Sequence, residues 1–512
     1  MPVRQIAALL CLLAAVGCAT IDYDYPRQPA YVVTDTTDTR LGLAVAPSAA
    51  SHPQSHAGFA PLNDGVDALA ARLVLARNAE RSIDVQYYLI KNDIVGRVFI
   101  AALLEAADRG VRVRLLLDDM FTAGHDIGLA ALDSHPNFAI RVFNPFYRGT
   151  GGRARSAATG FGRINRRMHN KSFTVDNQVT VVGGRNIAAE YFGAREDAKF
   201  GDLDVMGIGP VVQEVSDMFD TYWNHETALP VPAIVKELDD PEGALTKLRT
   251  QLATAMDDLR DSKYAAAVRV KYLDYLQPGK KLFDWSPFEL VVDSPDKGVK
   301  RKAQEADSIV TPLVQSIRSA ERELIIVSPY FVPTQSGVDG LAALERRGVE
   351  VTVITNSLAA NNQLAVHGGY AAARKPLLAA GVDIYEARPD ADVAGTEFVD
   401  ASGAKATLHT KAFMVDDREV FIGSFNFDPR SAYLNTELGI IIRNAELAAR
   451  YGLLIEQALS TQTFEVLLND DGDLSWRGYR DGAEIIYTKE PETTWVQRTM
   501  AWFARIIPKS QL

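Results

Sequence analysis

The sequence has almost no cysteine. Of its 512 residues only Cys11 and Cys18 are cysteines, so beyond the first 20 residues a disulfide, a cysteine-ligated zinc ion and a thiol nucleophile are all excluded. Positive charge is also in short supply, because the formal net charge is -11 at pH 7. Such a chain repels nucleic acid and anionic lipid on average, and an anionic substrate must therefore meet a local basic patch.

The apolar run near the N-terminus, from Ile6 to Val16, is too short to cross a bilayer as a mature helix. It is typical instead of a secretory signal. The ending Ala15-Val16-Gly17-Cys18 resembles a bacterial lipobox, in which the cysteine is lipidated and becomes the mature N-terminus, with Ala15 in place of the usual leucine. We therefore predict a lipoprotein signal peptide and a membrane-anchored location in the bacterial cell envelope. A plain signal peptide or an N-terminal membrane anchor is the alternative.

Helix-like and strand-like segments alternate in two similar series along the rest of the chain. In both series a glycine precedes a buried strand, in Arg109-Gly110-Val111 and again in Arg347-Gly348-Val349. This duplicated alternation predicts the α/β class, with two similar α/β/α sandwich halves packed to form one active site. The expected boundaries are a signal peptide at 1–18, a flexible tether at 19–56, a first half at 57–230, a helical connection at 231–284, a second half at 285–465 and a C-terminal appendage with an amphipathic helix at 466–512.

Each half contains one copy of a His-x-Lys-x4-Asp motif, followed at the same spacing by a glycine and an asparagine. The copies are His169, Lys171, Asp176, Gly183 and Asn186 in the first half, and His409, Lys411, Asp416, Gly423 and Asn426 in the second. Every internal spacing agrees, and chance is a poor explanation for that agreement. Because residues separated by one position share a face of a strand, the histidine and the lysine of each copy point the same way.

Two imidazoles, two ammonium groups and two carboxamides around one concavity suit a phosphodiester substrate. The lysines and the asparagines, Asn186 and Asn426, can stabilise the phosphoryl oxygens as charge develops on them. One histidine can attack phosphorus and form a phosphohistidine, while the other protonates the leaving alkoxide and later deprotonates the incoming hydroxyl. We expect no metal ion and no other cofactor, because the lysines neutralise the charge. The near-symmetry of the sequence leaves the order of the two histidines open.

Four acidic residues near the motifs have expected roles of two kinds. Asp176 and Asp416 belong to the catalytic motifs, but a carboxylate repels phosphate, so we expect them to hold a local turn or a lysine or arginine partner. Each catalytic histidine needs a partner that orients its second ring nitrogen. We predict Glu437 for this role in the second half and Asp202 in the first, with Asp204 as the fallback. The alternative is that these acids are solvated at strand ends.

These motifs resemble the phospholipase D superfamily, and specifically its two-motif members, from about residue 60 to residue 512. The stretches from Arg163 to Phe173, from Asn426 to Ser431 and from Trp495 to Leu512 resemble the C-type subgroup of bacterial cardiolipin synthases. The resemblance implies two phospholipase D-like halves. It also implies transfer of a phosphatidyl group from one phospholipid, phosphatidylethanolamine in C-type relatives, to the glycerol hydroxyl of phosphatidylglycerol.

The resemblance also implies roles for individual residues. It makes His169 the nucleophile and His409 the acid and base. One departure is Gly184, which stands where the second copy has Ser424, so that only the second copy offers a serine as a phosphate donor.

The ends of the chain favour a lipid over a nucleic acid as the substrate. A Gly/Arg-rich run from Tyr147 to Arg155, continued by Arg163, Arg166 and Arg167, could serve as the basic patch for either. The segment from Trp495 to Ile507 has a broad apolar arc flanked by cations, which suits either a bilayer interface or a helix docked on the core. We therefore expect phospholipid substrates and a membrane surface as partners, and no nucleic acid.

The predicted function is a phosphatidyltransferase that makes cardiolipin through a phosphohistidine intermediate. A phospholipase D hydrolase, with water as the acceptor, and a secreted nuclease could use the same site. A lipid-binding lipoprotein without activity is disfavoured because both motif copies are intact.

Overall fold

The computed structural model describes residues 21–148, 152–195, 198–275, 282–299, 308–391, 405–480 and 482–511. Cys18 and the predicted signal peptide lie outside these residues. No helix among the described residues has both the length and the apolar character that a membrane crossing requires.

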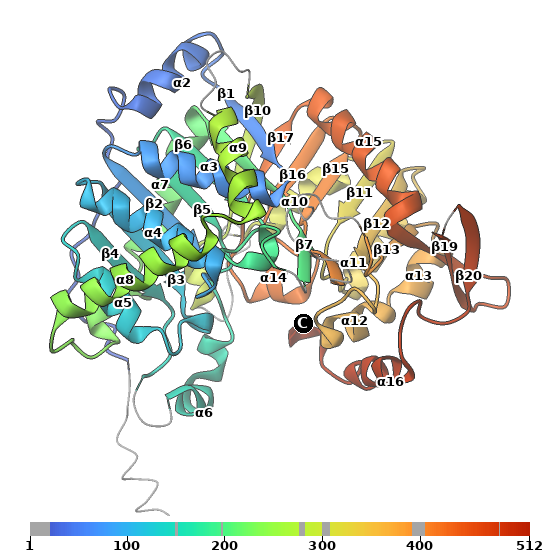
Figure 1. Ribbon diagram of the computed structural model, residues 1–512. Helices are drawn as coiled ribbons and strands as arrows, with labels where there is room; N and C mark the ends of the chain where they lie inside the picture. The colour runs from blue at the N-terminus through green and yellow to red at the C-terminus, as the bar shows by residue number, and fades with distance from the viewer. Residues whose placement is uncertain are drawn as a thin grey trace, which may run out of the picture.

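One mixed sheet of 18 strands runs through both halves of the described chain (Figure 1). In spatial order its strands are β9 (Ala228–Pro230), β4 (Phe138–Phe143), β3 (Arg112–Asp118), β2 (Ser82–Tyr87), β5 (Ser172–Val175), β6 (Val179–Gly183), β8 (Asp204–Ile208), β1 (His56–Leu62), β10 (Asp284–Val292), β17 (Leu438–Arg443), β16 (Glu419–Gly423), β15 (Ala412–Val415), β11 (Glu323–Val327), β12 (Glu350–Asn356), β13 (Asp383–Ala387), β18 (Thr463–Leu468), β19 (Leu474–Arg480) and β20 (Ala483–Tyr487). The antiparallel pair β1–β10 joins the two halves.

The duplication is visible in the strand order. In the first half the parallel pair β3–β2 is followed by β5, β6 and β8, and in the second half the parallel pair β12–β11 is followed by β15, β16 and β17. The prediction of two similar α/β halves is therefore confirmed.

Helices cover both faces of the sheet. They are α3 (Gly65–Asn78), α4 (Ile94–Asp108), α5 (Asp126–Asp133), α6 (Gly152–Ile164) and α7 (Pro210–Trp223) in the first half, α8 (Pro241–Leu259) and α9 (Lys263–Tyr275) in the connection, and α10 (Val310–Arg318), α11 (Gln335–Glu345), α12 (Leu364–Ala371), α13 (Arg374–Ala379), α14 (Pro429–Tyr433) and α15 (Ala445–Gln462) in the second half. Side chains alternate along each strand, so Leu115 faces the core under α3 and α4 while Leu116 faces the core that contains α7. This second core also contains residues of β15 to β17 and α15, and it therefore holds the two halves together.

The segment at 19–56 is not a free tether where the structure describes it. Its backbone binds the first half, since Asn224 and Asp220 accept the amide protons of Ala30 and Val32 at 3.0 and 2.7 Å. The helix α2 (Arg40–Ala50) follows. The prediction was wrong because this attachment uses backbone groups and polar side chains, which leave no hydrophobic periodicity in the sequence.

The C-terminal appendage is not separate from the second half either. Strands β18, β19 and β20 extend the sheet beyond β13, and the buried Trp476 donates a hydrogen bond to Glu386 at 3.0 Å. The last helix, α16 (Trp495–Ala504), packs against α12, where a Cβ on Gly368 would come within about 3 Å of the backbone of α16.

Candidate active site

Two contacts between the halves bring the motif copies together. The short strand β14 (Lys405–Leu408), which precedes His409, pairs in parallel with β7 (Ala198–Gly201) of the first half. The amide of His409 then donates to the carbonyl of Gly201 at 2.7 Å. In the same way the amide of His169 donates to the carbonyl of Thr436 at 2.9 Å. The histidine of each motif is thereby anchored beside an acidic residue of the opposite half.

The orienting acids are consequently exchanged between the halves. Nδ1 of His169 lies 2.9 Å from a carboxylate oxygen of Glu437, and Nδ1 of His409 lies 2.6 Å from one of Asp202. We had expected each acid to serve the histidine of its own half, and that pairing was wrong. The fallback, Asp204, instead binds the buried guanidinium of Arg72 at 2.8 Å. A carboxylate at Nδ1 holds the ring proton there and leaves the lone pair on Nε2.

Burial and charge favour the neutral form of both imidazoles. Burial lowers the pKa of His169, against the opposing effect of Glu437, and burial together with Lys411 lowers the pKa of His409 to about 3. Burial raises the pKa of Glu437 and Asp202, but the neighbouring histidines and lysines outweigh it and hold both values below the usual range. The acids are therefore ionised and the histidines are available as a nucleophile and a base.

Lys171 and Lys411 lie directly before β5 and β15, so each histidine and its lysine stand just outside the strand on which the spacing predicts them. Nζ of each lysine donates to the carbonyl of the histidine two residues earlier, and Nζ of Lys411 also lies 2.7 Å from Nδ1 of His409. Burial lowers the pKa of Lys171 to about 7 and that of Lys411 to about 8. A bound phosphate would restore full charge to both ammonium groups, because an anion nearby favours the charged form.

The two asparagines have carbonyl oxygens that lack a partner among the described residues. Nδ2 of Asn186 donates to the hydroxyl of Tyr191 at 3.1 Å, while Oδ1 of Asn186 and Oδ1 of Asn426 are buried without a hydrogen bond. An amide oxygen only accepts hydrogen bonds, so Nδ2 of each asparagine is the atom that could donate to a phosphate. Both residues remain predicted phosphate ligands.

Ser424, a predicted phosphate ligand, instead binds the acid that orients His169. Its hydroxyl donates to the Glu437 carboxylate and accepts from the amide of Leu438 at 3.0 Å, so its hydrogen is not offered to a phosphate. At the equivalent position of the first half, a Cβ on Gly184 would lie 2.2 Å from Oδ1 of Asp202. Ser424 thus holds the carboxylate of Glu437, while Gly184 leaves room for the carboxylate of Asp202.

Asp176 and Asp416 lie at the far end of the motif strands from the histidines. Asp176 accepts the amide protons of residues 80–82, and Asp416 accepts those of residues 321–323, at distances from 2.8 to 3.3 Å. Both have left-handed backbone conformations, with φ of 50° and 52°, as a tight hairpin turn between β5 and β6 or β15 and β16 requires. Their contacts are those of turn residues and place neither in the cluster of histidines.

Aromatic rings that we did not predict form the walls around the histidines. The ring of Tyr88 lies 5.1 Å from that of His169, edge to face. Tyr191, Phe200 and Tyr330 surround His409 at 4.9, 5.5 and 6.1 Å. Tyr88 lies one residue after β2 and Tyr330 three residues after β11, which are equivalent strands of the duplication, so a tyrosine soon after each strand was the available signal.

The arginine-rich run is largely occupied by structural contacts. Arg148 pairs with Asp119 and Asp126, and Arg167 donates to the carbonyl of Asn144 at 3.0 Å. The described arginines of this run therefore hold its own fold, which weakens its interpretation as a basic patch for headgroups. No group of three or more metal-binding side chains lies together in the described part of the chain.

The comparisons with known proteins identify the family of the chain. A family model described as "Cardiolipin synthase, PLD-like domain" matches residues 73–223 and 313–458. The chain is 42% identical over 473 residues to cardiolipin synthase C of Escherichia coli, covering 92% of this chain and 98% of that protein. It is 30% identical over 507 residues to a Helicobacter pylori protein, covering 97% of each. The structure of phosphatidylserine synthase from Haemophilus influenzae shares the fold, with a TM-score of 0.55 at 15% identity. The match covers 89% of this chain and 95% of that protein.

Proposed function

Because the chain belongs to the phospholipase D-like family of cardiolipin synthases, we propose that it makes cardiolipin by transferring a phosphatidyl group to phosphatidylglycerol. The observation that carries the proposal is the pair of buried histidines, each bound at Nδ1 by a carboxylate from the other half. This arrangement leaves a lone pair on each Nε2, beside two buried ammonium groups, as a two-step displacement at phosphorus requires.

In the first step Nε2 of His169 attacks phosphorus, and the bond from phosphorus to the leaving alkoxide oxygen breaks. His409 delivers a proton to that oxygen. The positive charge that develops on the imidazole of His169 faces the carboxylate of Glu437. Lys171 and Lys411 stabilise the negative charge on the phosphoryl oxygens. The negative charge of the bound phosphodiester favours the protonated form of His409 that this step needs.

In the second step the glycerol hydroxyl of phosphatidylglycerol attacks phosphorus and the phosphorus–nitrogen bond breaks. His409 takes the hydroxyl proton, so that both histidines return to their starting state when cardiolipin leaves. With phosphatidylethanolamine as the donor, the alcohol released in the first step is ethanolamine.

The test is a product assay with the purified protein in mixed vesicles. Phosphatidylglycerol with and without phosphatidylethanolamine is supplied, and cardiolipin, free ethanolamine and phosphatidic acid are resolved. We expect cardiolipin, with ethanolamine released when phosphatidylethanolamine is present, and loss of both in His169→Ala. Phosphatidic acid as the sole product would mean a hydrolase. Digestion of single-stranded DNA that disappears in His169→Ala would favour the nuclease.

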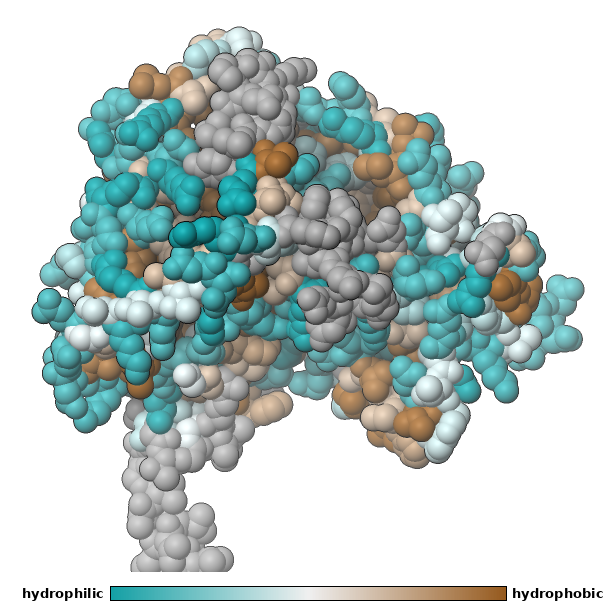
Figure 2. All heavy atoms as spheres, viewed as in Figure 1, coloured by the Kyte–Doolittle hydropathy of each residue, from teal (hydrophilic) through white to brown (hydrophobic). Residues whose placement is uncertain are grey.

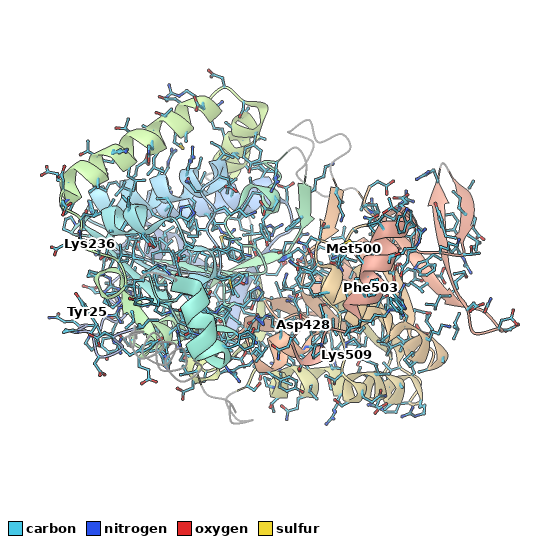
Figure 3. All side chains as sticks on the ribbon, turned by 90° about the horizontal axis from the view of Figure 1, so that it is seen from below. Tyr25, Lys236, Asp428, Met500, Phe503 and Lys509 are labelled. Atoms are coloured by element: carbon cyan, nitrogen blue, oxygen red, sulfur yellow. The ribbon has the colours of Figure 1, made fainter. Side chains whose placement is uncertain are left out.

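We also propose that α16 attaches the protein to the membrane surface. Its apolar side chains face outward: Trp495 is 71% exposed, Trp502 58% and Phe503 56%, whereas Ala501 is the residue that packs inward. Figure 2 shows this apolar patch at the lower edge of the molecule, and Figure 3, from below, shows Met500 and Phe503 on the same helix. Aromatic and aliphatic side chains beside cations such as Arg505 suit the bilayer interface.

Vesicle sedimentation tests this attachment. We expect Trp502→Ser/Phe503→Ser to lower binding to vesicles that contain phosphatidylglycerol. Leu453→Ser is the matched control, because Leu453 is 59% exposed on α15, and it should bind as the unaltered protein does. Equal binding of all three proteins would refute the proposal.

Cys18 supplies a second attachment in this proposal, since it is the predicted lipidation site. We expect Cys18→Ser to abolish incorporation of labelled palmitate in cells and Cys11→Ser to retain it. Labelled Cys18→Ser would exclude lipidation at this position.

A further inference from the structure

A largely apolar cavity opens beside His169. It lies between α4, α5, α8 and the ends of β2 and β3. Tyr88 and Asp118 line its inner end. The ring of Tyr88 is also the wall of the catalytic site, 5.1 Å from the ring of His169, so one aromatic ring separates the cavity from the reacting histidine.

The cavity, at ≈ 510 Å³, has the volume of a small-molecule pocket, and its walls are chiefly aliphatic. The lining includes Ile100, Leu117, Leu129, Leu132, Leu248 and Leu252. At its rim Phe121 and Ile127 are 47% and 70% exposed, and Lys91, Arg97 and Lys247 also contribute to the lining. The aliphatic interior matches an acyl chain in size and in polarity.

We propose that this cavity holds an acyl chain of the phospholipid whose phosphate reacts at His169. The inference rests on the proposed function and adds to it a binding site for the lipid tail. Continuity with the catalytic site supports it, because Tyr88 belongs to the walls of both. The connection between the halves supports it too: helix α8 contributes Leu248 and Leu252 to the cavity and so completes an apolar enclosure over α4 and α5.

Moving an acyl chain from a bilayer into the cavity gains little, because both surroundings are apolar. The gain appears only when the chain enters the cavity from water, so the substrate must be dissolved as monomers. For a lipid dispersed as monomers, each methylene group that enters the cavity should raise kcat/KM by up to about fourfold. The assay therefore uses monomeric phosphatidylglycerols, with acyl chains from butanoyl to octanoyl, and measures the slope of log kcat/KM against chain length.

Gly128 offers a way to fill the cavity with little damage to the fold. It lines the cavity from α5, its φ lies outside the left-handed region, and a Cβ added to it meets nothing within 4 Å. Gly128→Phe should put a ring into the cavity, and Gly128→Ala is the matched control that changes helix propensity alone. Leu248→Trp fills the cavity from the opposite wall, on α8.

We expect a steep slope for the unaltered protein and for Gly128→Ala, and a flattened slope for Gly128→Phe and Leu248→Trp. A small phosphodiester without acyl chains, bis(p-nitrophenyl) phosphate, should be hydrolysed equally by all four proteins, which controls for folding and for the catalytic site. Equal slopes in all four proteins, or a flat slope in the unaltered protein, would overturn the inference. Absence of turnover of any phospholipid by the unaltered protein would instead refute the proposed function.

Discussion

Replacing Glu437 with glutamine removes a buried negative charge 2.9 Å from Nδ1 of His169 and nearly preserves the side-chain volume. With an effective dielectric constant of about 20, a full positive charge on the imidazole gains roughly 6 kcal/mol from a carboxylate at 2.9 Å. If about half of that charge has developed in the transition state, roughly 3 kcal/mol is lost, which is about a hundredfold in rate.

The glutamine amide adds a second effect, because it can donate to Nδ1 and shift the ring proton to Nε2. The corresponding tautomer error in a hydrolase triad costs about ten-thousandfold. We therefore expect Glu437→Gln to slow formation of the phospho-enzyme by a factor between about 10² and about 10⁴.

A rapid-quench assay with phosphate-labelled phospholipid measures this step directly. Since Glu437 contacts His169 although it belongs to the other half, Glu437→Gln should resemble His169→Ala, with little labelled protein. Asp202→Asn should resemble His409→Ala, in which labelled protein can accumulate because the acceptor is not deprotonated.

The opposite pattern would refute the assigned roles. If Glu437→Gln accumulates label and Asp202→Asn fails to form it, then His409 is the nucleophile. If Glu437→Gln forms and loses label at the unaltered rates, the contact between Glu437 and His169 has no role in orienting the histidine. Near-ultraviolet circular dichroism of each variant establishes that the fold is retained.

Three further predictions concern charge, space and the turns. Burial lowers the pKa of Lys171 to about 7 and that of Lys411 to about 8, so kcat/KM should fall as pH rises through this range. The decline in kcat, which reports the enzyme with its substrate bound, should come at higher pH. A kcat/KM that rises between pH 7 and pH 8 would contradict this prediction. Gly184→Ala should displace Asp202, whose Oδ1 would lie 2.2 Å from the new Cβ, and lower transfer activity without preventing folding, as activity and thermal unfolding together would show. Asp416→Ala should cost about 2 to 4 kcal/mol of stability through lost amide contacts and a left-handed alanine, whereas Asp416→Asn should cost less in the same unfolding experiment.

Local sequence predicted the parts of the molecule that depend on local physics. The alternation of helices and strands follows from the periodicity of side chains along each element, and the duplication follows from the matched series of elements in the two halves. The turns at Asp176 and Asp416 are of the same kind, because a left-handed hairpin position favours aspartate and asparagine wherever it occurs.

The attachments between distant segments could not be predicted in this way. Ala30 and Val32 bind the first half through backbone amides, and Trp476 binds Glu386 across a sheet extension. These contacts join positions that are 90 to 194 residues apart, and they leave no periodic pattern near the residues that make them.

The sequence by itself determined the candidate catalytic groups: two histidines, two lysines and the acids proposed to orient the histidines. Only the tertiary structure decided which acid serves which histidine. Glu437 reaches His169, and Asp202 reaches His409, because the segment before each histidine is bonded to the backbone beside the acid of the other half. Hydrogen bonds between halves are set by how two folded surfaces meet, and spacing along one chain carries no record of that.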